Sequence, residues 1–407
     1  MEANQEGEEV TGTRTGQSEE QKLLQRVWSW GAGTDGQLST GKLEDENLPQ
    51  LLLHFPNLSS AGTVSMLACG GAHVIALTSA GKVLTWGRGT SGQLGHGEML
   101  SSLDPQPVNF LDCYVITHVS AGWSHSGFVS DTGSLFTCGD GSFGQLGHGD
   151  YESHCVPVQV SYFINGHVEQ IACGMRHSLV LLKDCAGKQI YGFGSGKRGQ
   201  LGISRDKVKS ICVPQVVHGV EDIEIISICA NGDHSAALSV DGKLHLWGRG
   251  FAGTSDVLTL QHFVSSLKFC KVALGWNHAL ALTADGGEVY ILGGDHHGVL
   301  GDLEKINLQK HSDSTCAALN RVSGLDETEV VDIAAGAEHS ALLTVDGAIK
   351  TWGWGEHGQL GLGSTSDQTS PQTVILGHQT QNQEDVLKVY CGSGFTFVTR
   401  TPFPCQT

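Results

Sequence analysis

Residues 68–95 read ACGGAHVIALTSAGKVLTWGRGTSGQLG, and this stretch decides the fold. It contains two short apolar runs, 74–78 and 83–86, separated by the turn-forming residues 79–82. Two such runs joined by a short glycine-containing connection are typical of a β-hairpin. The run that follows, Gly-Arg-Gly-Thr-Ser-Gly, predicts a tight turn, because glycine adopts conformations that other residues avoid.

The same unit recurs along nearly the whole chain. Its histidine recurs at intervals of between 44 and 61 residues, and a seventh copy has Phe395 in its place. The Trp-Gly half also occurs seven times, with apolar substitutes Cys138, Phe193 and Leu292. A period near 50 residues that holds four short strands is typical of a propeller blade. The histidines are His73, His125, His177, His234, His278 and His339.

The order of the half-units predicts how the ring closes. The chain begins with a Trp-Gly half at 27–31 and ends with a Gly-x-x-His half at 386–399. Pairing the two would complete a seventh blade and remove the free sheet edges of an open array. We therefore expect an all-β, seven-bladed propeller over 27–400, an acidic and disordered tail over 1–26, and a short tail over 401–407.

These repeats resemble the regulator-of-chromosome-condensation repeat family, and the resemblance covers about 27–400. Among its members are nuclear exchange factors and the plant ultraviolet-B photoreceptor, and the similarity is strongest to plant members of unassigned role. The resemblance implies the propeller fold, and one fold hosts many functions.

Composition narrows the function classes. The chain carries a net charge of −18, which disfavours binding to nucleic-acid phosphates and to anionic membranes, although a local basic patch is compatible with it. It contains no apolar run of signal-peptide or transmembrane length, and no Cys-x-x-Cys pair among its 12 cysteines. We expect a cytoplasmic or nuclear protein with no cofactor and no metal.

Two repeated features invite a chemical interpretation that their context disfavours. Gly-x-Gly-x-x-Gly occurs six times, each time after a strand and never opening a helix, so it predicts turns and not a dinucleotide site. The six repeat histidines should lie one per blade, each bonded to nearby backbone groups in its own turn. Asp295-His296-His297 lacks a further ligand at metal-site spacing and is expected in a solvated loop.

The two residues between glycine and histidine are the candidate binding positions. They vary while the flanking positions stay uniform, and they should form a ring on one face. Trp, Met and Arg are frequent interface anchors, although Trp123 and Trp276 could equally pack against neighbouring turns. The predicted partner-binding residues are Trp123, Met175, Arg176, Asp233, Trp276, Asn277 and Glu338.

The same ring bears on light sensing. The plant photoreceptor is characterised by Gly-Trp-Arg-His-Thr repeats in adjacent blades. Here Gly-Trp-x-His occurs only at Trp123 and Trp276, three blades apart, followed by Ser124 and Asn277. We therefore expect no tryptophan clustering, and ultraviolet-B sensing is the least favoured function.

Irregular repeats are the remaining candidates. The fifth Trp-Gly unit loses Gln-Leu-Gly, and the next repeat contains a polar excursion over 302–329 that either binds a partner or is a tolerated insertion. The leading prediction is a non-catalytic scaffold that binds a protein partner on one propeller face. The alternative, implied by the family resemblance, is a guanine-nucleotide exchange factor for a small GTPase, which needs no covalent chemistry.

Overall fold

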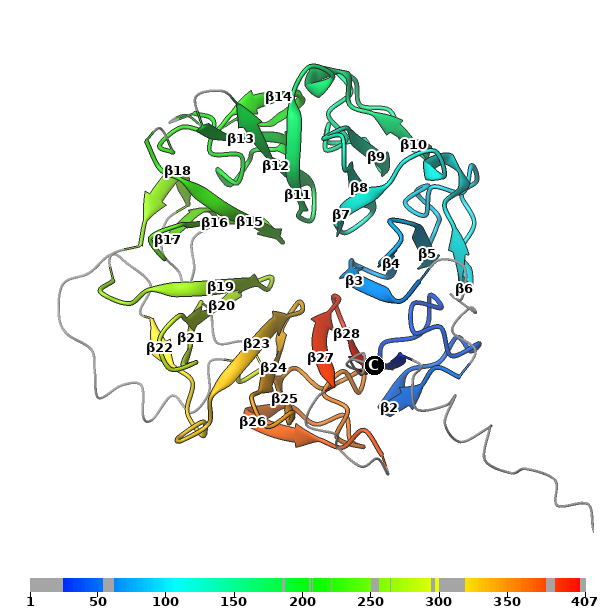
Figure 1. Cartoon of the computed structure of the whole chain (residues 1–407), viewed down its shortest axis with the longest axis vertical. Helices are drawn as coiled ribbons and strands as arrows, with labels where there is room; N and C mark the ends of the chain where they lie inside the picture. The colour runs from blue at the N-terminus through cyan, green and yellow to red at the C-terminus, as the bar shows by residue number, and fades with distance from the viewer. Residues whose placement is uncertain are drawn as a thin grey trace, which may run out of the picture.

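The structure, a computed structural model, consists of seven four-stranded antiparallel sheets arranged around a central axis (Figure 1). It describes residues 25–53, 62–184, 187–204, 206, 208–220, 222–249, 256–263, 265–293, 297–299, 319–377 and 385–402. Residues 1–24 of the predicted tail over 1–26, and residues 302–318 of the excursion over 302–329, lie outside these residues. The prediction of an all-β, seven-bladed propeller is confirmed.

We number the blades so that blade 1 closes the ring, and give each blade's strands from the axis outward. Blade 1 contains β27 (Val386–Cys391), β28 (Phe395–Thr401), β1 (Arg26–Gly31) and β2 (Glu46–Leu51). Blade 2 contains β3 (Val64–Cys69), β4 (His73–Thr78), β5 (Val83–Gly87) and β6 (Ser102–Pro107). Blade 3 contains β7 (Ile116–Ala121), β8 (His125–Ser130), β9 (Leu135–Gly139) and β10 (His154–Gln159). Blade 4 contains β11 (His167–Cys173), β12 (His177–Asp184), β13 (Gly187–Ser195) and β14 (Ser210–Val216).

Blade 5 contains β15 (Ile225–Asn231), β16 (His234–Ser239), β17 (Leu244–Gly248) and β18 (Val257–His262). Blade 6 contains β19 (Phe269–Leu274), β20 (His278–Thr283), β21 (Val289–Gly293) and β22 (Asn320–Arg321). Blade 7 contains β23 (Val330–Ala335), β24 (His339–Thr344), β25 (Ile349–Gly353) and β26 (Gln368–Val374). Two 3-10 turns, η2 (Asn109–Leu111) and η3 (Ser161–Phe163), lead from the outer strands of blades 2 and 3 to the next inner strands. No helix in the described ranges has the length and apolar content that crossing a membrane requires.

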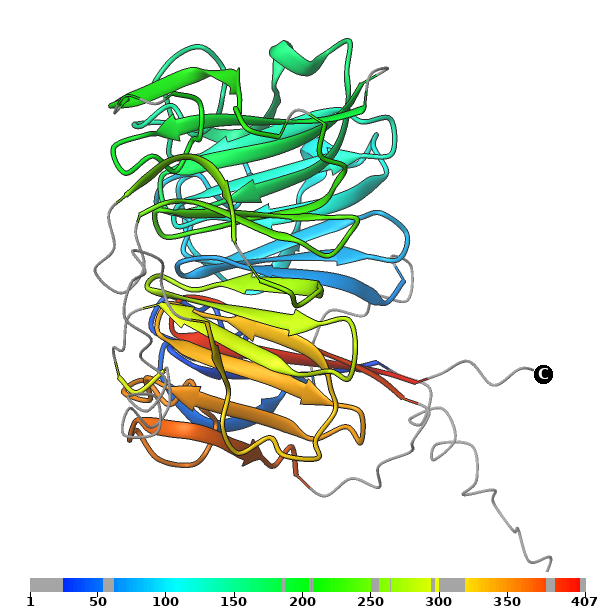
Figure 2. The ribbon, with the colours of Figure 1, turned by 90° about the vertical axis from the view of Figure 1, so that its left-hand side faces the viewer.

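Ring closure joins the two ends of the chain, as predicted. Strand β1 pairs antiparallel with β28, in a register that runs from Arg26 opposite Arg400 to Gly31 opposite Phe395. Strands from both ends of the sequence therefore share blade 1, where blue and red ribbons lie together in Figure 1 and Figure 2. Because β1 also pairs with β2 and β28 with β27, both strands have a neighbour on each side and neither is an open edge.

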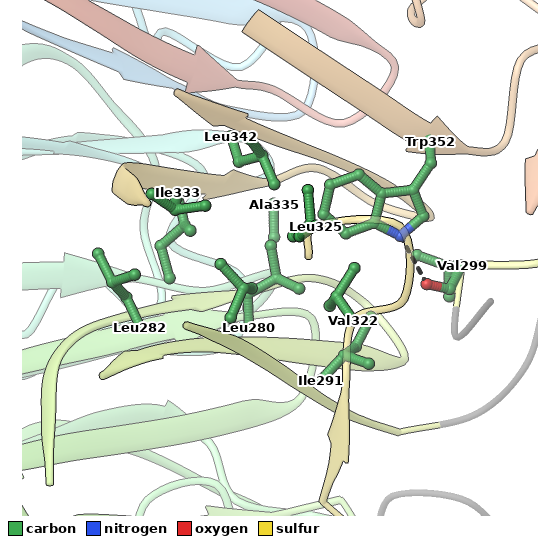
Figure 3. Close-up of a cluster of buried hydrophobic side chains, with 12 residues drawn as sticks. Leu280, Leu282, Ile291, Val299, Val322, Leu325, Ile333, Ala335, Leu342 and Trp352 are labelled. Carbon is green, nitrogen blue, oxygen red and sulfur yellow. Dashed lines mark hydrogen bonds between the residues drawn. The ribbon is translucent and has the colours of Figure 1, made fainter. Parts of the chain in front are cut away.

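The core is divided among the spaces between neighbouring blades. In one such cluster, Leu280 and Ile291 of blade 6 pack against Ile333 and Trp352 of blade 7 (Figure 3). The Trp352 indole Nε1 donates a hydrogen bond of 2.8 Å to the Val299 carbonyl of the preceding blade. Because the second and third strands of a blade are covered on both sides, they are buried along their whole length, as β4 and β5 are.

Tryptophans of the Trp-Gly halves repeat this bond at three other blade boundaries. Each donates its indole N–H, at 2.9 Å, to the carbonyl of a glutamine in the Gly-Gln-Leu segment of the preceding blade. The three donor–acceptor pairs are Trp30 with Gln359, Trp86 with Gln37, and Trp247 with Gln200. The two halves of the repeat are therefore bonded to each other across blades.

The repeat histidines also join one blade to the next. Five of the six place Nε2 between 2.9 and 3.1 Å from a Ser or Thr hydroxyl that follows the histidine position of the next blade. At His234 both ring nitrogens face backbone carbonyls instead: Nδ1 lies 2.9 Å from that of Arg249, and Nε2 lies 2.6 Å from that of Trp276. The expectation that each histidine bonds to backbone groups of its own turn is therefore wrong for the other five. The five pairs are His73–Ser126, His125–Ser178, His177–Ser235, His278–Ser340 and His339–Thr396.

The exceptions in the sequence match this bonding pattern. Blade 1 has Phe395 in place of histidine, and the corresponding hydroxyl position of blade 2 is Val74. Blade 6 has Ala279 at its hydroxyl position, and the preceding histidine, His234, bonds to a backbone carbonyl instead. A buried imidazole therefore occurs where a hydrogen-bond partner is available.

Glycines of the outer turns are required by contacts. At Gly87, φ is +94°, and at Gly89 an added Cβ would lie 1.8 Å from the Leu100 carbonyl oxygen. The first position needs a left-handed backbone and the second needs room for a neighbouring chain. These turns pack against the backbone of neighbouring segments, which agrees with the prediction that Gly-x-Gly-x-x-Gly forms turns and not a dinucleotide site.

Candidate functional site

Two sets of loops share one face of the propeller. The inner loops join the first and second strands of each blade, and the outer loops join the third and fourth. Backbone bonds hold the two sets together, for example from Arg88 N to Ala72 O at 2.8 Å and from Trp354 N to Glu338 O at 2.8 Å. All seven variable residue pairs lie in the inner loops, so we call this surface the Trp face, after Trp123, Trp276 and Trp354.

At the centre of the Trp face, Trp123 and Trp276 meet across the channel. Their ring centroids are 5.1 Å apart and the planes are inclined by 48°. The expectation that tryptophans three blades apart would not cluster is therefore wrong. The Arg88 guanidinium lies 5.6 Å from the centroid of Trp123, within the range of a cation–π interaction.

The central channel beneath this pair holds a cavity of about 420 Å³. Its walls come from the inner strands of several blades, and include Met66, Cys69, Ser120, Cys173, Met175 and Ser393. Burial raises the pKa of the Cys173 and Cys391 thiols to about 12 and that of Cys229 to about 11. These thiols are therefore protonated at neutral pH and are poor nucleophiles.

The other predicted partner-binding residues surround the pair. Met175 is half-buried and lines the cavity, while Arg176 is exposed, with its guanidinium 4.9 Å from the centroid of the Phe143 ring. Asp233 accepts a hydrogen bond of 2.9 Å from the buried Gln200 amide. The structure thus places these predicted residues on one surface, which leaves their role in binding a prediction.

Asn277 and Glu338 belong to a cluster that the sequence did not reveal. Asn277 Nδ2 donates to Glu338 Oε1 at 2.6 Å, and His297 Nε2 lies 3.1 Å from Glu338 Oε2. The other nitrogen of His297 lies 2.8 Å from Asp367 Oδ2. The two ring nitrogens of His297 therefore face two different carboxylates.

His297 is exposed and lies in a turn, as expected for a solvated loop, and the sequence did not reveal its contacts with Glu338 and Asp367. Asp295 and His296 lie outside the described residues. Within those that are described, no three His, Cys, Asp or Glu side chains are arranged to hold a metal ion.

The pairing of His297 follows a pattern that could have been found in the repeat alignment. His297, His357 and Arg198 each precede a turn glycine of an outer loop, and each contacts an aspartate at the start of the next blade's outer strand. The distances are 2.8 Å for His297–Asp367, 2.8 Å for His357–Asp45 and 3.5 Å for Arg198–Asp256. Trp354 lies between the two histidines, with centroid distances of 5.6 and 5.0 Å.

The six repeat histidines lie beneath this surface and are not exposed on it. Burial lowers the pKa of four of them to about 3 and of His125 and His234 to about 4. They are therefore neutral at physiological pH, which suits their bonds between blades.

Comparison with known proteins places this architecture in a family, because the RCC1-like domain pattern matches residues 26–398. The chain belongs to the RCC1-like domain family. Ultraviolet-B receptor UVR8 of Arabidopsis thaliana is 32% identical over 81% of this chain and 73% of that protein. The mouse secretion-regulating guanine nucleotide exchange factor is 30% identical over 93% of this chain and 85% of that protein.

Solved structures agree on the fold of this RCC1-like propeller. Prp20p from Saccharomyces cerevisiae, described together with its binding to Gsp1p and histones, superposes with a TM-score of 0.78. The match covers 96% of each chain at 22% sequence identity, so it shows the shared fold alone. The resemblance seen in the repeats is confirmed.

Proposed function

We propose that this RCC1-like propeller is an interaction scaffold that holds a protein partner on its Trp face. The observation that supports this most strongly is the Trp123–Trp276 pair at the centre of that face, with both indoles half-buried. Central tryptophans with adjacent arginines are the residues that contribute most to protein–protein affinity. The buried histidines and cysteines among the described residues are neutral, so the role we propose for this face is binding a partner.

The proposal is tested by comparing two paired variants of the full chain. Trp123→Ala/Trp276→Ala removes both indoles and leaves the Trp276 carbonyl, which bonds to His234. The control, Phe110→Ala/Tyr162→Ala, removes exposed aromatic rings from η2 and η3, away from the channel. Proteins captured by each immobilised variant are quantified, and the dissociation constant is then measured for a purified partner.

We expect the tryptophan variant to bind its partner more weakly by about 2 kcal/mol or more, which is a loss of roughly thirtyfold. The control should bind like the unmodified protein. Equal binding by both variants, with the circular dichroism spectrum of the fold preserved, would place the partner elsewhere and refute the proposal.

A second candidate is guanine-nucleotide exchange on a small GTPase, favoured by the 30% identity to the mouse exchange factor over most of both chains. Exchange needs only tighter binding to the nucleotide-free GTPase than to the nucleotide-bound form. Release of a fluorescent guanine nucleotide from a panel of GTPases tests it. Acceleration that is lost in Trp123→Ala, Arg176→Ala or Trp276→Ala would establish an exchange factor that uses this face. No acceleration, beside a working exchange factor, would leave the scaffold.

A further inference from the structure

One sector of the Trp face is basic, although the chain as a whole is acidic. It comprises the inner and outer loops of blade 4 and the start of the outer loop of blade 5. All five of its described cations are exposed. We call these residues the basic sector: Arg176, Lys197, Arg198, Lys209 and Arg249.

Backbone hydrogen bonds show that the loops of the basic sector adjoin one another. Ser195 N, at the start of the outer loop of blade 4, donates to Arg176 O at 2.7 Å. The neighbouring inner loops are joined from Met175 N to Gly232 O at 3.0 Å, and Arg249 N donates to Asp233 O at 2.9 Å. Residues far apart in sequence therefore form one continuous surface beside the Trp123–Trp276 pair.

Three described carboxylates lie in or beside these loops. Asp233 accepts from the Gln200 amide, and Asp256 lies 3.5 Å from Arg198. Asp206, in the outer loop of blade 4, is exposed, so the five cations outnumber the nearby carboxylates. Across the part of the chain that the structure describes, Arg176, Lys197 and Arg249 make no ion pair. Their charges therefore remain available to a partner.

The opposite side of the Trp face has the opposite charge pattern. There Glu338, Asp367 and Asp45 cluster with His297 and His357. A partner on this face therefore meets a positive surface on blades 4 and 5 and an acidic one on blades 7 and 1. Such polarity orients a charged partner during encounter and disfavours the reversed orientation.

We propose that the basic sector binds an acidic segment of a protein partner, with an apolar side chain of that segment placed on Met175 and the Trp123–Trp276 pair. This inference rests on the proposed function, since it names the chemistry of the partner at the same face. Carboxylates fit the exposed arginines, which bind them in a bidentate manner. Nucleic acid is the less suitable polyanion, because the chain's charge of −18 repels a long phosphate backbone.

The test measures binding of a fluorescein-labelled peptide, made of glutamates around a central Leu-Phe pair, by fluorescence anisotropy. The test variant is Arg176→Glu/Arg249→Glu. The matched control, Lys82→Glu/Lys243→Glu, makes the same number of charge reversals on the opposite face, where the turns after β4 and β16 lie. A lysine peptide with the same Leu-Phe pair serves as the probe of opposite charge.

We expect the acidic peptide to bind the unmodified protein and the control equally, and the test variant at least about tenfold more weakly. The difference should shrink as salt is raised, and the lysine peptide should bind at least about tenfold more weakly than the acidic one. An equal loss of affinity for the acidic peptide in the test variant and the control would show that only the net charge of the protein matters, and would overturn the inference. Tighter binding of oligothymidylate than of the acidic peptide would overturn it in favour of nucleic acid.

The same variants separate this inference from the proposed function. If Trp123→Ala/Trp276→Ala loses its protein partners while Arg176→Glu/Arg249→Glu retains them, the Trp face is a binding surface. The inference that the partner presents an acidic segment is then wrong. If neither variant loses partners, the proposed function itself fails.

Discussion

Replacing the His177–Ser235 pair by the apolar pair found at another blade boundary should lower the free energy of unfolding by less than the sum of the two single substitutions. His177 is fully buried, and its Nε2 lies 3.0 Å from Ser235 Oγ. At the equivalent boundary, Phe395 of blade 1 faces the Val74 position of blade 2. His177→Phe/Ser235→Val therefore copies an arrangement that the same protein already contains.

The surroundings of the pair favour a clean measurement. An added Cβ at Gly174 would lie 2.2 Å from the His177 ring, and one at Gly392 would lie 2.1 Å from the Phe395 ring. Each glycine thus makes room for its ring in the same way. The Gln200 carbonyl, which accepts from Ser235 Oγ at 2.7 Å, also accepts from the Trp247 indole at 2.9 Å, so it keeps a donor when the hydroxyl is removed.

The magnitudes follow from which polar atoms lose their partners. Ser235→Val leaves the His177 imidazole buried without its hydroxyl, which costs about 1–3 kcal/mol. His177→Phe leaves Ser235 still bonded to Gln200, so its cost should be near the lower end of that range. In the double variant no imidazole remains to be desolvated, so we expect a favourable coupling energy of about 1–3 kcal/mol.

The free energy of unfolding of the four proteins in this cycle is measured by urea denaturation, followed by tryptophan fluorescence and circular dichroism. Additivity of the two single changes within about 0.5 kcal/mol would refute the reasoning, because it would show that the bond contributes no specific stability. A double variant less stable than either single variant would show that Phe395 fits blade 1 for reasons peculiar to that blade.

Three further outcomes follow from the geometry. Burial holds the pKa values of the six repeat histidines below their unfolded value of about 6.5, so below that pH the unfolded chain binds more protons than the folded protein. The free energy of unfolding should therefore fall as the pH drops below about 6.5, by on the order of 8 kcal/mol in total at pH 5.5. A urea midpoint that stays constant from pH 7 to about pH 5 would contradict this. The indoles of Trp123 and Trp276 should give an exciton couplet in circular dichroism that Trp276→Phe removes and Trp354→Phe preserves; equal spectra for both variants would show that the indoles do not meet. The boundary between blades 5 and 6 lacks both repeated bonds, having Ala279 and Leu292 at the hydroxyl and tryptophan positions, so β19 and β20 should exchange amide hydrogens faster than β4 and β5; uniform protection around the ring would contradict it.

Much of the fold could be predicted because its signals are local. Glycine-bounded apolar runs indicate hairpins, and their recurrence indicates blades. The unequal halves at the two ends indicated closure through β1 and β28, since any other pairing would leave open edges. The bonds between blades could also be predicted by comparing neighbouring repeats. For five of the repeat histidines, the residue after the histidine position of the next blade is Ser or Thr. For Phe395, the corresponding residue is Val74.

The propeller, its blade count and the ring of variable residues on one face follow from short-range patterns repeated along the chain. Which members of that ring meet depends on how the blades are arranged around the axis. Trp123 and Trp276 are three blades apart, and in a ring of seven that separation places their blades nearly opposite each other across the axis. All inner loops converge on the axis, so two long side chains from nearly opposite blades come into contact across the channel.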